Sequence, residues 1–62
     1  MKLRTKFQDE DFELGEVVDA DIATMPDGRI KIQAVAKAGG LHTIFYDKLK
    51  DLVEEWEDVP EA

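Results

Sequence analysis

The stretch IKIQAVAKA, residues 30–38, constrains the fold most strongly, because its side chains alternate between two sides along its whole length. A period of two residues is typical of a β-strand with one buried face. The stretch therefore predicts a half-buried strand whose inner face is made mostly of small residues. The side chains of the inner face are Ile30, Ile32, Ala34, Ala36 and Ala38, and those of the outer face are Lys31, Gln33, Val35 and Lys37.

The segments on either side of this stretch predict two further strands. Residues 16–25 place Val18, Ala20 and Ile22 on one face, and the sequence PDGR then separates them from residue 30. Proline presets φ at the first turn position and glycine accepts a positive φ, so we expect a hairpin with a type I turn and a bulge. Residues 41–46, LHTIFY, are rich in β-branched and aromatic side chains and predict a third strand.

Residues 47–58 predict a helix that closes the core. Asp47 is a suitable cap for its start, and Pro60 cannot continue it. The small inner face of residues 30–38 leaves room for Trp56, which we expect to be buried with its indole N–H bonded at the rim of the sheet. The alternative is an exposed Trp56 that anchors a partner. The helix has one apolar stripe with helical spacing, formed by Leu49, Leu52, Val53 and Trp56.

The second face of the sheet needs a cover. We expect residues 3–7 to add a fourth strand with Leu3, Thr5 and Phe7 on one side, and Phe12 and Leu14 to tuck in after an acidic bend. Alternatively, this face is a dimer interface. Its expected apolar residues are Val17, Met25, Val35, Ile44 and Tyr46.

These elements together predict the fold class. We expect an α+β fold in which an antiparallel β-meander of three or four strands is packed by one C-terminal helix. The chain would be a single domain over residues 1–62. Its parts would be a strand-rich region 1–46, a helix 47–58 and a short tail 59–62.

The composition limits the partners. Fifteen acidic and eight basic residues give a net charge of −7, which would repel a nucleic-acid backbone, so we expect no direct nucleic-acid binding. No run of about 18 apolar residues occurs, so we expect no membrane span. Residues 1–7 are basic but precede no apolar segment, and we therefore expect a cytoplasmic protein without a secretory signal. Absence of cysteine in so small a chain favours a homodimer.

The residue patterns argue against an enzyme. Asp9, Asp11 and Glu13 alternate as in a calcium loop, but Leu14 and Ala20 stand where that loop needs glycine and glutamate. His42 is the only histidine and has no evident nucleophile or second strong ligand nearby in the sequence. We therefore expect no catalytic residue, no metal site and no cofactor.

Two acidic clusters are the candidate interaction residues. The cluster near the C-terminus opposes the dipole of the expected helix, so helix stability does not explain it, although solubility would. We expect a non-catalytic protein-interaction module that binds a basic partner surface. One alternative is a structural protein that self-associates through a sheet edge or an apolar sheet face, and another is an acidic mimic of nucleic acid. The clusters are Glu54, Glu55, Glu57 and Asp58, and Asp9, Glu10, Asp11 and Glu13.

The end of the chain also carries a resemblance. Its pattern Tyr-x-x-Leu-x-x-Leu-x-x-x-Trp-Glu-Asp, residues 46–58, resembles the close of small uncharacterised proteins of phages and mobile elements of Gram-positive bacteria. The resemblance covers the last third of the chain. It implies an accessory role for a phage or mobile element, and no particular mechanism.

Overall fold

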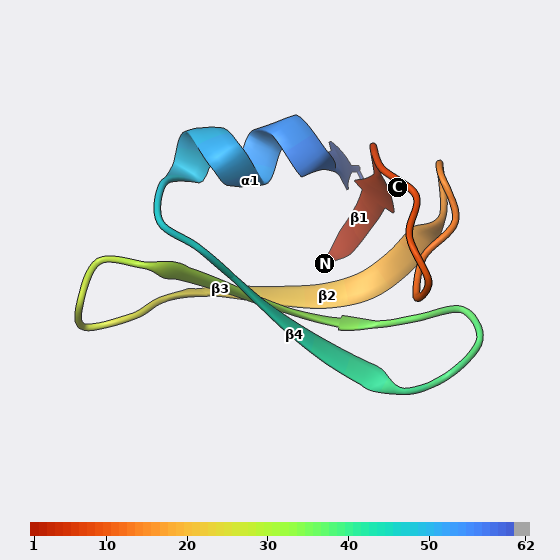
Figure 1. Cartoon of the computed structure of the whole chain (residues 1–62), viewed down its shortest axis with the longest axis horizontal. Helices are drawn as coiled ribbons and strands as arrows, with labels where there is room; N and C mark the ends of the chain where they lie inside the picture. Colours follow the sequence, from red (N-terminus) through yellow and green to blue (C-terminus); the bar gives the residue numbers. More distant parts are fainter. Residues whose placement is uncertain (61–62) are drawn as a thin grey trace.

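The computed structural model describes residues 1–60, which form one antiparallel five-stranded sheet and one short helix (Figure 1). The strand order across the sheet is β4-β3-β2-β1-β5. The predicted α+β class, a meander packed by a helix, is confirmed, but the sheet has five strands. The elements are β1 (Lys2–Thr5), β2 (Val17–Thr24), β3 (Ile30–Val35), β4 (Leu41–Tyr46), α1 (Leu49–Glu55) and β5 (Trp56–Val59).

The β2–β3 hairpin has the predicted turn. Gly28 N–H donates to the Met25 carbonyl over 2.9 Å, Met25 N–H donates to the Arg29 carbonyl, and Gly28 has a φ of 91°. This is a type I turn followed by a glycine in the left-handed region. The β3–β4 turn is built in the same way, with the φ of Gly39 at 102°. Local turn chemistry therefore sets the meander.

The N-terminal residues form an additional strand, as expected, but it ends at Thr5 and does not include Phe7. It lies within the sheet and does not cover the second face, where Val17 and Val35 stay exposed. β1 pairs with β2 on one side and β5 on the other, and its Leu3 and Thr5 are buried. Phe12 also tucks into the core, as predicted. The expectation for Leu14 was wrong, because its side chain is 65% exposed beyond the end of the sheet.

The predicted helix over residues 47–58 was too long. It spans Leu49–Glu55, its cap position is Lys48 without a side-chain bond, and Trp56 has extended backbone angles. Trp56 to Val59 instead form β5, because these residues pair with β1 in the register Thr5 to Trp56. The backbone bonds of that pairing replace the last helical turn.

The predicted facing of residues 41–46 was also wrong. The register pairs Ile44 with Ile32 and Tyr46 with Ile30, which places both β4 side chains on the inner face. Tyr46 is in the core and Ile44 packs against it. The outer face of β4 carries Leu41 and Phe45, both more than two-fifths exposed. Apolar residues occur on both faces of this strand, so the hydrophobic pattern did not fix its phase.

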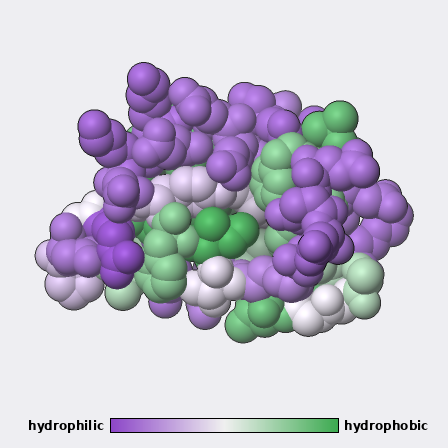
Figure 2. Space-filling model, in the orientation of Figure 1, coloured by the Kyte–Doolittle hydropathy of each residue, from purple (hydrophilic) through white to green (hydrophobic). Residues whose placement is uncertain are grey.

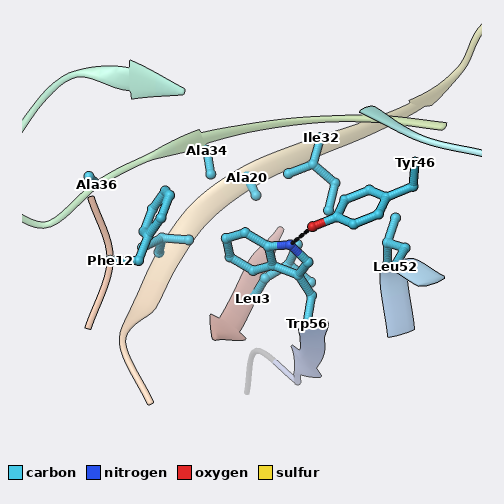
Figure 3. Packing of buried hydrophobic residues seen from close by; sticks show 10 residues of the cluster. Leu3, Phe12, Ala20, Ile32, Ala34, Ala36, Tyr46, Leu52 and Trp56 are labelled. Atoms are coloured by element: carbon cyan, nitrogen blue, oxygen red, sulfur yellow. Dashed lines mark hydrogen bonds between the residues drawn. The ribbon is translucent and has the colours of Figure 1, made fainter. Parts of the chain in front are cut away.

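The core is centred on Trp56, which is buried as predicted (Figure 3). Its indole lies beside the small side chains of Ala20 and Ala34. Its N–H donates to the Tyr46 hydroxyl over 2.8 Å. Of the predicted helical stripe only Leu52 joins Trp56 inside. Leu49 and Val53 are 60% and 48% exposed. Hydrophilic side chains cover the surface around α1, whereas hydrophobic ones gather over the strands (Figure 2).

Candidate protein-interaction groove

The loop of residues 6–16, between β1 and β2, is closed by a buried threonine. Thr5 is 2% exposed, and its hydroxyl donates to the Glu13 carbonyl over 2.5 Å and accepts from Glu16 N–H over 3.0 Å. The Thr5 N–H also donates to the Glu16 carbonyl. These bonds hold the base of an otherwise charged loop, and they fix where its tip lies.

The tip of the loop is ordered by one of its own carboxylates. Asp9 Oδ1 accepts from the N–H groups of Asp11 and Phe12 over 2.8 and 2.9 Å. Phe12 then turns inward, with its ring edge to face against Trp56 and Phe7 at centroid distances of 5.5 and 5.9 Å. Because Phe12 anchors the tip, the carboxylates of Asp9 and Asp11 are displayed from a fixed backbone.

A second carboxylate joins the loop to the β3–β4 turn. Glu16 accepts from Glu13 N–H over 3.0 Å and from Lys37 N–H over 2.7 Å. These two backbone donors lower the pKa of the Glu16 carboxyl, since they bond to its charged form. This contact could not be predicted from the sequence, because Glu16 and Lys37 are far apart in the chain and neither belongs to a recognisable motif.

A groove of about 510 Å³ lies between this loop, β4 and the end of α1. Its three acidic side chains are Asp9, Asp11 and Glu55. The half-buried ring of Phe7 provides apolar surface beside them, whereas Phe12 is only 2% exposed. The only side chain of basic type among the described residues that line it is His42. The lining residues are Phe7, Asp9, Asp11, Phe12, His42, Thr43, Ile44 and Glu55.

Two contacts position groups inside the groove. Glu55 Oε2 accepts from the Tyr46 hydroxyl over 3.2 Å, which links it to the core through the Trp56 bond. His42 Nδ1 lies 3.8 Å from Asp11 Oδ2, and its ring packs edge to face on Phe12 at 5.2 Å. Burial raises the pKa of Tyr46 to about 12, and the nearby Glu55 charge adds to this, so the hydroxyl is a neutral donor at ordinary pH.

The structure distributes the eight predicted interaction residues over several places. Asp9, Asp11 and Glu55 come together in the groove. Glu10 and Glu13 line a neighbouring hollow that also includes Lys37. The others lie outside both: Glu54 and Asp58 are exposed, and Glu57 pairs with Arg4 across β5 and β1 over 3.4 Å.

Sequence reasoning missed the groove itself. Glu55 was assigned to one acidic cluster and Asp9 and Asp11 to the other, and only the tertiary fold unites them. Sequence reasoning predicts only a cover for the sheet from Phe7 and Phe12, and not the place of Phe7 in the groove. In the part of the chain that the structure describes, no group of three or more ligating side chains is arranged to hold a metal ion.

No family model, no curated protein and no solved structure matches the chain. Within residues 1–60, no helix is long and apolar enough to cross a membrane. The chemistry of the groove therefore decides which function the fold supports best.

Proposed function

We propose that the chain is a non-catalytic protein-interaction module whose groove binds arginine or lysine side chains of a basic partner. The observation that carries the proposal is the meeting of Asp9, Asp11 and Glu55 beside the half-buried ring of Phe7. Carboxylates accept charge-assisted bonds from a guanidinium or ammonium group, and aromatic faces attract the same cations. A cationic side chain would satisfy both parts of the groove at once.

The charge of the whole molecule favours the same partner. The net charge of −7 would attract a basic surface over a distance of about a Debye length and would speed its association. The sheet does not need the groove carboxylates as charges, because their bonds to Asp11 N–H, Phe12 N–H and the Tyr46 hydroxyl require only an acceptor oxygen. The negative charge is thus free to serve recognition.

The geometry around His42 supports a non-catalytic role. Thr43 has the nearest hydroxyl in the chain sequence, but neighbouring residues of a strand point to opposite faces. His42 shares the inner face with Ala34, its partner in the register, and its ring packs on Phe12. The β4 hydroxyl on the same side as His42 is that of Tyr46, and it is already bonded to Trp56 and Glu55.

The test compares two triple variants that remove the same amount of charge. The groove variant carries Asp9→Asn, Asp11→Asn and Glu55→Gln, which keep the acceptor oxygens. The control variant neutralises three exposed acids outside the groove with Asp51→Asn, Glu54→Gln and Asp58→Asn. The probe is a blocked octapeptide of alternating arginine and threonine, with binding measured by fluorescence anisotropy at low and high salt.

We expect the groove variant to bind the probe about tenfold more weakly than the parent at low salt, which corresponds to about 1.4 kcal/mol. The control variant should lose about threefold or less, because exposed charges away from the site act only through the screened long-range field. Equal losses in the two variants would mean that net charge alone attracts the peptide. The proposal of a groove site would then be wrong.

A further inference from the structure

We infer that the partner enters as an extended strand that pairs with the free edge of β4, with its basic side chains directed into the groove. The inference rests on the proposed function and specifies the form of the partner. Three residues of β4 line the groove, His42, Thr43 and Ile44, so a chain bound there lies beside this strand. β4 is an edge of the sheet, and no strand of residues 1–60 pairs with its outer side.

The two edges of the sheet differ in how they are protected. β5, the other edge strand, has the sequence WEDV, which includes two acids. It is followed directly by Pro60, which has no N–H. Charges and proline are the usual features that prevent an edge from accepting another strand. β4 has the sequence LHTIFY, with no proline and no acidic, lysine or arginine side chain. The edge beside the groove is the unprotected one.

The β3–β4 turn identifies which backbone groups of β4 are available. Ala36 N–H donates to the Gly40 carbonyl over 3.1 Å, so these two residues form a bonded pair. Bonded and non-bonded pairs alternate along an antiparallel ladder. His42 and Ile44 therefore bond towards β3. The N–H and carbonyl groups that point away from β3 belong to Leu41, Thr43 and Phe45.

The same alternation fixes the side chains of an added antiparallel strand. Its residues opposite His42 and Ile44 would point to the inner face, as those two residues do. The inner face beside them is the groove with its three carboxylates. A partner segment with arginine or lysine at every second position would thus place successive cations in the groove. Its intervening residues would supply the backbone bonds to β4.

Charge selects this occupant over a second copy of the chain. Pairing β4 with β4 of another copy would bring together two chains of net charge −7, with their grooves next to the shared edge. Like charges brought together in this way oppose association. A basic segment meets the same edge with the opposite charge.

The first experiment uses N-methylated forms of the alternating arginine–threonine octapeptide. In the antiparallel arrangement, which every pair in this sheet has, the threonine N–H groups face β4 and the arginine N–H groups face solvent. Methylation of two central threonine nitrogens should weaken binding about tenfold, while methylation of two central arginine nitrogens should change it about twofold or less. On binding, amide exchange of Leu41, Thr43 and Phe45 should slow.

A substitution in β4 tests the same pairing through a change in the protein instead of the peptide. Thr43→Pro removes an N–H that β3 does not use, and edge strands tolerate proline at such positions. It should weaken the peptide about tenfold, and Thr43→Val, which keeps the N–H, should bind the peptide clearly more tightly than the proline variant. If the proline variant fails to fold, the methylated peptides still decide the question.

The results distinguish this inference from the proposed function. If the two methylated peptides bind equally and the groove variant still binds more weakly than the parent, strand addition is wrong. The cation-binding groove is then still supported. Equal losses of peptide affinity in the groove variant and in the control variant would overturn the proposed function. Slow exchange of Leu41, Thr43 and Phe45 in the chain alone, with a dimer in sedimentation, would show that a second copy occupies the edge and would overturn the inference.

Discussion

The indole of Trp56 and the carboxylates of the groove lie close to the same phenylalanine, Phe12, yet their surroundings are opposite. Trp56 is 2% exposed, and its single polar atom has a partner inside the protein. Asp11 is exposed, and its Oδ2 lies 3.8 Å from Nδ1 of His42. The difference indicates that packing around Trp56 holds the fold together, while the charges beside it are available for another purpose.

Replacement of Trp56 should have the largest effect on stability. Trp56→Ala removes the side chain at the centre of the core and should lower the free energy of unfolding by about 3–5 kcal/mol, close to the whole stability of a small domain. Leu49→Ala is the matched control, because Leu49 belongs to the same helical stripe and is 60% exposed. Urea unfolding measures both. Similar midpoints for the two variants would contradict the account of the core.

Loss of the buried hydroxyl of Thr5 should have the next largest effect. Thr5→Val keeps the shape of the side chain but removes two hydrogen bonds, so that the Glu13 carbonyl and the Glu16 N–H keep only their bond to each other. We expect a loss of about 2 kcal/mol, since each lost hydrogen bond contributes about 1 kcal/mol. Thr43→Val, on the exposed edge of β4, is the control and should unfold like the parent. A Thr5→Val protein as stable as the parent would mean that the bonds of the Thr5 hydroxyl do not hold the loop.

The Tyr46 hydroxyl links the core to the groove, and its titration should change the free energy of unfolding only at alkaline pH. Tyr46 titrates at about 12 in the folded chain because burial disfavours its charged form, against about 10 when unfolded. A folded pKa above the unfolded one gives stability that is complete below pH 10 and is lost as pH rises to 12. The unfolding free energy of the parent should therefore fall over this range. Tyr46→Phe has no such group, and an identical decline in that variant would refute the assignment.

Local features of the chain could be predicted, and long-range ones could not. Pro26 and Gly28 specify their turn by their own backbone preferences, and the alternation from Ile30 to Ala36 specifies its faces, so both predictions held over these residues. Ala38, predicted on the inner face, is instead exposed in the β3–β4 turn, because the strand ends at Val35. Trp56 continues a helical spacing from Leu52, and only its pairing with Thr5 makes it a strand residue. Such pairing depends on a segment about fifty positions away and overrides the local pattern.

The groove shows the same limit. Asp9 and Asp11 were recognised as candidates, and so was Glu55, but their meeting depends on the phase of β4 and the early end of α1. The eight acidic candidates look equivalent in the sequence. In the structure three of them share an aromatic groove, and Glu57 is paired with Arg4.

The most direct test of the contrast between core and groove measures stability and binding on the same groove variant, Asp9→Asn, Asp11→Asn and Glu55→Gln. Because the acceptor oxygens remain and three mutually repelling charges disappear, its urea midpoint should equal or slightly exceed that of the parent. Its affinity for the arginine–threonine octapeptide should fall about tenfold at low salt. A variant that loses stability but binds the peptide as tightly as the parent would contradict the account, because the carboxylates would then serve the fold and not a partner.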